Sequence, residues 1–265
     1  MTTGAFASAT AVTPTGDGTY SATVEPGWDI GGNANGGYLL AIAGRALVDA
    51  TGRPDPVTVT GHFLSPGPTG PLALVTDVVK EGKRFATGRC TMHAGDRPLL
   101  TVLGTFGDLG DESGGLMVDG EPPELPPVEA CVRFGTEGVR PPFNSKVETY
   151  LHPDDTGFTR GEPSGVARIR GWFRLLGEEP IDTVALLCAL DALPPTIFNT
   201  NLPLGWTPTV ELTCHVRARP VRGWLRCRFT TRFVTGGFLE EDGELWDEAG
   251  HLVAQSRQLA LVPRG

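Results

Sequence analysis

The residue that most strongly suggests chemistry is Asp191, a single acid near the end of an apolar segment. The eight residues before it are apolar except for Thr183, so no polar helix face can be drawn. A helix that is apolar all round is buried, and a carboxylate on it loses hydration or has a raised pKa. Such a carboxylate can act as a general base near neutral pH. The structural alternative is that Asp191 caps a loop or pairs with an arginine such as Arg174.

Histidines and cysteines give weaker signals. His62 and His215 have a residue type that titrates near neutrality, but they occupy equivalent places in the repeat described below, which favours a structural role on strands. The five cysteines are odd in number and widely spread, and the chain has neither a C-x-x-C motif nor a histidine pair with metal-ligand spacing. We therefore expect a reduced protein with no metal and no cofactor.

The bulk composition is that of a globular protein. The chain has 265 residues, of which 40% are hydrophobic and 20% charged, with a net charge of −9. This acidity argues against a nucleic-acid partner. The first ten residues lack the charged start and apolar stretch of a signal peptide, and no apolar run is long enough for a membrane span. We expect a cytoplasmic location.

A segment rich in Gly, Pro and acids divides the chain. It predicts an N-terminal unit over residues 1–107, a linker over 108–145 and a C-terminal unit over 146–265. The two units resemble each other in pattern. An offset of 153 residues places His62 on His215, Gly70 on Gly223, Leu72 on Leu225 and Phe85 on Phe238.

Each unit has the same predicted order of elements. An apolar helix, over residues 35–50 in the first unit and around Asp191 in the second, precedes strands that alternate with period two and are separated by Gly-bearing turns. The prolines Pro194 and Pro195 should end the second helix just past Asp191. The sequence therefore predicts an α+β fold of two curled antiparallel sheets, each wrapping a long central helix.

This arrangement resembles a duplicated (double) hotdog, and more closely the type II acyl-CoA thioesterases and thioesterase-like proteins. The matching segments are N-G-G-Y-L-L-A-I-A, H-F-L-S-P-G and K-E-G-K-R-F-A-T-G-R in the first unit, and A-L-D-A-L-P-P, P-T-V-E and V-A-Q-S-R-Q in the second. Together they extend the resemblance over nearly the whole chain. It implies an enzyme that hydrolyses acyl-CoA to a free acid and CoA.

The resemblance also implies catalytic residues. The family uses an Asp on the second helix, a Thr that opens the next strand and a Gln on the last strand, and these places correspond to Asp191, Thr209 and Gln258, with Thr207 as the rival threonine. A hydroxyl and an amide can together hold the water that the carboxylate activates.

The Gly36–Gly37 pair opens the first helix and offers backbone N–H groups for the thioester oxygen, unless it is only a loop-to-helix turn. We expect Asn35 to cap this helix, although it could also touch the acyl carbonyl.

The substrate pocket and the CoA contacts are less sharply defined. Aromatic residues expected to line the pocket are Tyr38, Phe63 and Trp206. CoA phosphates need cationic partners, and Arg84, Arg217 and Arg219 are candidates among clusters of basic residues that are more often a solvated face. The partner expected is an acyl-CoA substrate, and the units could assemble further into a homo-oligomer through exposed sheet edges.

Two other functions compete with hydrolysis. One is a catalytically weak acyl or acyl-CoA binding protein on the same scaffold, although a binder has no need for a buried base. The other is an enoyl-CoA hydratase, a class that resembles this fold and carries an Asp followed five positions later by a His. Here Thr196 stands five positions after Asp191, so the hydratase interpretation is disfavoured.

Overall fold

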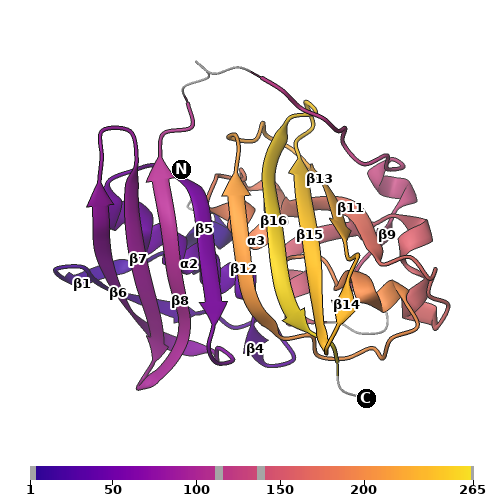
Figure 1. Ribbon diagram of the computed structural model, residues 1–265, viewed down its shortest axis with the longest axis horizontal. Helices are drawn as coiled ribbons and strands as arrows, with labels where there is room; N and C mark the ends of the chain where they lie inside the picture. Colours follow the sequence, from indigo (N-terminus) through magenta and orange to yellow (C-terminus); the bar gives the residue numbers. More distant parts are fainter. Residues whose placement is uncertain (1–3, 111–115, 136–140, 264–265) are drawn as a thin grey trace.

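The computed structural model describes residues 4–110, 116–135 and 141–263. One continuous antiparallel sheet contains most of the described strands, and two α-helices lie against its concave face (Figure 1). The elements of the first half are α1 (Ala5–Ala9), β1 (Thr13–Gly16), β2 (Thr19–Val24), β3 (Asp29–Ile30), β4 (Asn33–Ala34), α2 (Gly36–Thr51), β5 (Asp55–Phe63), β6 (Gly70–Glu81), β7 (Ala86–Ala94) and β8 (Arg97–Gly107). Those of the second half are β9 (Val132–Arg133), β10 (Val147–Leu151), β11 (Arg168–Leu175), α3 (Ala185–Ala189), β12 (Thr209–Val216), β13 (Leu225–Thr230), β14 (Val234–Thr235), β15 (Phe238–Trp246) and β16 (Leu252–Leu261).

The sheet has the same strand order in its two halves. From the outside inward, the first half runs β2-β6-β7-β8-β5 and the second runs β11-β13-β15-β16-β12. The halves join where β5 pairs with β12, in an antiparallel register that sets Thr60 opposite Thr213. The prediction of two separate sheets is therefore wrong, because the backbone groups at the inner edges of β5 and β12 pair with each other and close both edges.

A β-bulge occurs at the same place in both halves. The register shifts between Thr209 and Glu211 on β12, and between Pro56 and Thr58 on β5. A bulge adds one residue to one strand and so reverses the face to which the preceding side chains point. As a result Thr209, which stands before the bulge, lies opposite the buried Ala260 and on the same face as Gln258.

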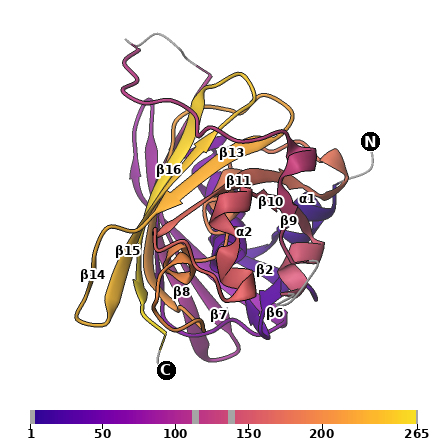
Figure 2. The ribbon, with the colours of Figure 1, turned by 90° about the vertical axis from the view of Figure 1, so that its right-hand side faces the viewer.

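Helix α2 is long, apolar and buried, as its sequence predicts. The side-chain oxygen of Asn35 accepts a hydrogen bond from the backbone N–H of Tyr38, which caps the first turn. Gly52 ends the helix in the left-handed conformation at φ 63°. Most of its residues, 11 of 16, are buried, and the helix contacts β6, β7, β8 and α3. Figure 2 shows the helix enclosed on one side by the curved sheet.

Helix α3 is much shorter than predicted. It spans only Ala185–Ala189, and the turns after it are tighter: the N–H of Asp191 bonds to the carbonyl of Cys188 at 3.1 Å. Before it, the Asp182 carboxylate accepts from the N–H of Ala185 at 2.8 Å and so starts the helix late. The prediction of a long central helix in each half is therefore wrong for the second half, and Asp191 follows the helix rather than standing on it.

The hydrophobic core is continuous across the two halves. It contains residues of α2, α3 and the inward-facing side of the strands, and the stacked pair Trp28 and Tyr38, with ring centroids 4.8 Å apart, lies within it. The segment 108–145 contributes the edge strand β9 to the sheet and the buried side chain of Phe143 to this core. Among the described residues, no helix is long and apolar enough to cross a membrane.

Candidate active site

Asp191 lies where the end of α3 meets the start of α2. Its Oδ2 accepts a hydrogen bond from the backbone N–H of Gly37 at 2.8 Å and from the Asn35 side-chain amide at 3.1 Å. The same Asn35 amide donates to the Asp191 backbone carbonyl at 2.8 Å. The Asn35 oxygen meanwhile caps α2, so one side chain fixes both the helix start and the acid.

Glycine at position 37 is required by the close approach of the two segments. A Cβ atom on Gly37 would lie 2.8 Å from the Cβ of Asp191 and 2.9 Å from the carbonyl oxygen of Cys188. At Gly36 it would lie 3.0 Å from both the Asp191 carboxylate and the Phe63 ring. The glycine pair therefore lets the positive end of α2 reach the carboxylate.

The surroundings of Asp191 favour a base that works near neutral pH. Burial raises the pKa of Asp191 to about 6, although hydrogen bonds from Gly37, Asn35 and Gly36 act in the opposite direction. The Arg174 alternative is excluded, because that guanidinium pairs with Glu148 and Glu178 instead. The carboxylate is thus held by neutral donors, which leaves its charge available for proton transfer.

Thr209 and Gln258 contact each other on the inward face of the sheet. The Gln258 amide nitrogen donates a hydrogen bond to the Thr209 hydroxyl at 2.8 Å. The rival Thr207 is on the preceding loop, where its hydroxyl donates to the carbonyl of Gly205. Among the described residues no direct hydrogen bond joins Asp191 to this pair.

A second buried acid, Glu241, belongs to the same region and was missed by sequence reasoning. It lies directly opposite Gln258 across β15 and β16, and its Oε2 accepts from the N–H of Thr196 at 2.7 Å. Burial raises its pKa to about 7, and the nearby Asp191 carboxylate adds to the rise. Its sequence signal is hidden, because F-L-E-E-D-G-E-L-W carries several acids and only the strand register shows which one points inward.

The first half has no polar counterpart of these residues. Its bulge places Pro56 at the position of Thr209, and the strand pairs Val59–Gly104 and Gly104–Gly88 place glycines at the positions of Gln258 and Glu241. A Cβ atom on Gly88 would lie 2.8 Å from the Leu47 side chain. In the first half, the last turns of the long helix α2 fill this space. In the second half α3 is short, and the side chains of Thr209, Gln258 and Glu241 occupy the equivalent space.

The predicted pocket residues have different locations. Phe63 is beside Gly36 and therefore beside Asp191. Tyr38 is fully buried in the core, and its hydroxyl donates to the carbonyl of Ala9 at 2.8 Å. Trp206 is 50% exposed on the loop before β12. Of the three side chains, that of Phe63 is the one that lies beside the contact between Gly36 and the Asp191 carboxylate.

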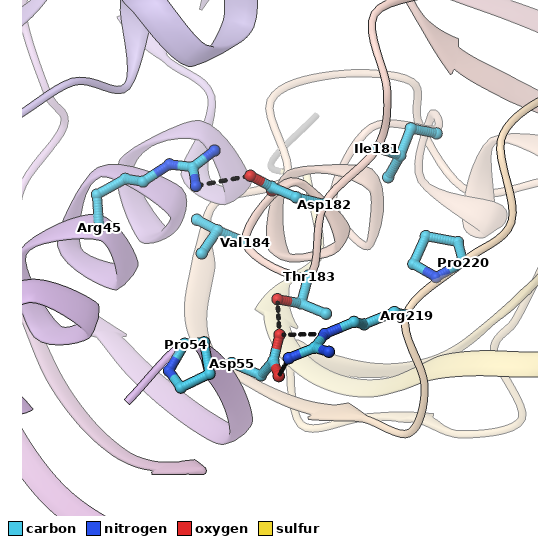
Figure 3. A pocket seen from close by; sticks show the side chains of 9 residues that line it. All are labelled: Arg45, Pro54, Asp55, Ile181, Asp182, Thr183, Val184, Arg219 and Pro220. Carbon is cyan, nitrogen blue, oxygen red and sulfur yellow. Dashed lines mark hydrogen bonds and ion pairs between the residues drawn. The ribbon is translucent and has the colours of Figure 1, made fainter. Parts of the chain in front are cut away.

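The predicted CoA-binding arginines lie at the other end of the strands. Arg219 pairs with Asp55 at 2.6 Å and with Asp108 at 2.9 Å, beside a cavity of about 290 Å³. Figure 3 shows this cluster, in which Thr183 also bonds Asp55. Arg217 donates to Gln255, and Arg84 stacks on Phe85. The structure therefore does not bring these arginines to the Asp191 site.

The two histidines are exposed on the face of the sheet away from α2, His62 opposite Glu211 and His215 opposite Thr58. Neither reaches Asp191. Within the described part of the chain, no group of three or more His, Cys, Asp or Glu side chains could hold a metal ion.

Comparison with known proteins adds a family to this geometry. Residues 24–107 match the model of the acyl-CoA thioesterase N-terminal domain, and residues 120–262 match that of the acyl-CoA thioesterase C-terminal domain. An uncharacterised protein of Mycobacterium tuberculosis (strain H37Rv) is 32% identical over 263 residues, which cover 89% of this chain and 88% of the relative.

Solved structures agree with these matches. A candidate thioesterase II from Thermobifida fusca is 33% identical, with a TM-score of 0.91 and coverage of 100% of this chain and 99% of its own. A hotdog-fold protein of unknown function from Alicyclobacillus acidocaldarius is 21% identical, with a TM-score of 0.88 and full coverage of both chains, and shows the fold alone.

Proposed function

Because the chain belongs to the acyl-CoA thioesterase family, with both the N-terminal and the C-terminal domain of that family, we propose that it hydrolyses an acyl-CoA thioester to a free acid and CoA. The observation that carries this proposal is the Asp191 carboxylate, which is buried, held by neutral donors and has a pKa raised to about 6. A carboxylate of that kind is charged at neutral pH and basic enough to accept a proton.

Asp191 is proposed as the general base. A water oxygen attacks the carbonyl carbon while Asp191 takes one proton from that water. The tetrahedral intermediate then collapses, the carbon–sulfur bond breaks, and the departing thiolate recovers the proton from Asp191. The acid, the thiol and the starting carboxylate result, so atoms and charge balance without a cofactor.

Thr209 and Gln258 are proposed to hold the attacking water. The Thr209 hydroxyl accepts from Gln258, so its own proton can be donated to a water or to the substrate. The Gln258 amide has a second N–H and a carbonyl oxygen, which can complete the water's hydrogen bonds. Holding the water in one orientation lowers the entropic part of the barrier.

Gly36 and Gly37 are proposed to stabilise the negative charge as it moves. In the structure the Gly37 N–H donates its hydrogen bond to the Asp191 carboxylate, so it is not free to bind a thioester oxygen in this state. As Asp191 becomes protonated, negative charge develops on that oxygen, and the same helix N-terminus can stabilise it there. Phe63, packed beside Gly36, would form part of the wall for the acyl group.

We also propose that the fold arose by duplication of a single hotdog unit. The repeated strand order and the repeated bulge support a double hotdog made by duplication, with units over residues 1–107 and 146–265. Only the second unit supplies Thr209, Gln258 and the acid, while the first supplies the glycine pair, so a single site is expected at the contact between the units.

A thiol-release assay tests the function directly. Wild-type protein is given acyl-CoA substrates of increasing chain length, beside Asp191→Asn and the control Asp182→Asn, which removes an acid at the other end of the same segment. We expect Asp191→Asn to lose about 10²–10⁴-fold in kcat/KM and the control to remain active. If Asp191→Asn hydrolyses as fast as wild type, this mechanism is wrong. A wild-type protein that binds acyl-CoA without turnover would favour a binding function.

A further inference from the structure

Glu241 is a second buried carboxyl group at the site, and the reaction proposed above gives it no task. Its side chain is on the inward face of β15 and the residue is only 8% exposed. Among the described residues it forms no ion pair with a lysine, arginine or histidine. A buried carboxyl group without a cationic partner is far less costly when it is protonated.

The strand register places Glu241 beside the water-holding pair. Glu241 and Gln258 lie directly opposite each other on β15 and β16, an arrangement that puts Cβ atoms about 4.5–5.5 Å apart. Gln258 in turn donates to Thr209 at 2.8 Å. Glu241, Gln258 and Thr209 therefore form a row of polar side chains on one face of the sheet.

Of the titratable groups around this row, Asp191 has the largest effect on the pKa of Glu241. The carboxylate of Asp191 and, less strongly, that of Glu240 both raise the pKa of Glu241. Around Asp191 stand the buried thiols of Cys188 and Cys214, which are neutral because burial raises their pKa well above the usual value. Within the described part of the chain no ion pair thus compensates two ionised carboxylates here, and the pair favours a single negative charge near neutral pH.

The distribution of donors decides which acid carries that charge. Asp191 receives hydrogen bonds from Gly37 and Asn35 at the positive end of α2, whereas among the residues that the structure describes the donors to Glu241 come from Thr196. Hydrogen bonds to the charged form favour ionisation. The charge therefore resides on Asp191 and the proton on Glu241.

We propose that Glu241 is a positioning residue of this site, which stays protonated beside an ionised Asp191 and orients the Gln258 amide. A protonated carboxyl group can donate as well as accept, so Glu241 can donate to the Gln258 carbonyl oxygen and turn the amide nitrogen toward Thr209. Ionisation of Glu241 removes that donor and adds a second negative charge where the thioester oxygen becomes negative. This inference rests on the proposed hydrolysis.

The pH dependence of kcat/KM separates this role from a structural one. Wild type should give a bell-shaped profile that rises as Asp191 ionises and falls as Glu241 ionises. Glu241→Gln keeps a neutral side chain with a donor at every pH, so its alkaline limb should disappear. The ratio of variant to wild-type kcat/KM should then rise about tenfold per pH unit above the alkaline midpoint. The control Glu244→Gln, on the outer face of the same strand, should keep the wild-type profile.

A titration of the carboxyl carbons by ¹³C NMR tests the same inference without turnover. We expect the Glu241 carboxyl to titrate near neutral pH, its midpoint to fall in Asp191→Asn, and the Gln258 side-chain amide signals to follow the Glu241 titration. A folded Glu241→Gln enzyme with the wild-type alkaline limb, or a Glu241 that titrates at the ordinary value and ignores Asp191→Asn, would overturn the proposal. If wild type hydrolyses no acyl-CoA but the Glu241 titration still depends on Asp191, the proposed function is refuted while the electrostatic coupling of Glu241 and Asp191 stands.

Discussion

The hydroxyl oxygens of Thr60 and Thr213 lie 2.9 Å apart across the junction of β5 and β12, and the two residues are 153 positions apart in the chain. This separation equals the offset of the sequence repeat. The two threonines are therefore repeat equivalents that face each other. The pairs on either side, Val59 with Cys214 and Gly61 with Leu212, are exchanged by an approximate two-fold axis that passes between the threonines. An axis at this point generates two equivalent positions at opposite ends of β5 and β12. At one stand Thr209, Gln258 and Glu241, and at the other stand Pro56, Gly104 and Gly88.

The hydrogen bond between Gln258 and Thr209 should show as coupling in kinetics. We expect Thr209→Val and Gln258→Leu each to lower kcat by about 10-fold to 100-fold, because each removes one group that orients the water. The double variant should lose less than the product of the two factors, since either change alone already frees the water. Steady-state kinetics of the four proteins measures this, and strictly multiplicative losses would argue that the two residues act separately.

Replacement of Gly37 should damage the site more than replacement of another glycine in the same helix. In Gly37→Ala the new Cβ meets the Asp191 Cβ at 2.8 Å and backbone at 2.9 Å, so the two segments must separate. In Gly44→Ala it meets side chains alone, the end of Leu187 at 3.0 Å, which can rotate, and Val184 at 3.4 Å. We expect Gly37→Ala to lose at least tenfold in kcat/KM and about 1–3 kcal/mol of unfolding free energy, measured by urea denaturation beside Gly44→Ala.

Removal of the Asp191 charge should stabilise the protein. The folded-state pKa of about 6 exceeds the unfolded value of about 4, so the folded state binds more protons and the unfolding free energy falls as pH rises between these values. At about 1.4 kcal/mol per pKa unit, Asp191→Asn should be more stable than wild type by up to about 3 kcal/mol at pH 7. The advantage should vanish below pH 4. Thermal unfolding at pH 4 and pH 7 measures the difference, and equal shifts in Tm at both values would contradict it.

The ion pair between Arg219 and Asp55, at the end of β5 and β12 away from Asp191, should affect stability and leave substrate affinity unchanged. Burial alone would raise the pKa of Asp55, but hydrogen bonds from Arg219, Leu109 and Thr183 lower it. The pair therefore contributes above the unfolded pKa of about 4, and its contribution is lost as pH falls through the lower folded value. Because Arg219 is 49% exposed and screened, we expect Arg219→Ala to cost about 1–2 kcal/mol at pH 7. A raised KM for acyl-CoA in this variant would instead restore Arg219 as a CoA contact.

The periodicity of the sequence was enough to predict the strands of the two meanders and their repeat, but it did not reveal β2, β10 or β11. Alternation of apolar and polar residues depends only on neighbouring positions, and β7 and β13 follow it closely, both in residue type and in burial. The helix after Asn35 was equally visible, since a capping residue, an unbroken apolar run and Gly52 all agree. The same local signals misjudged α3, because Asp182 caps the helix at Ala185 and the chain tightens at Cys188–Asp191, so that only Ala185–Ala189 are α-helical.

For the candidate site, too, some features could be predicted from the sequence and others depended on the tertiary structure. Sequence alone singled out Asp191, because an acid in an apolar run violates the local pattern, and it named the two glycines beside it. Tertiary structure decided what these residues contact. The register of β15 selected Glu241 among neighbouring acids, the bulge turned Thr209 toward Gln258, and strand direction carried Arg84, Arg217 and Arg219 to the far end. These outcomes depend on backbone pairing between segments far apart in the chain, which no local pattern encodes.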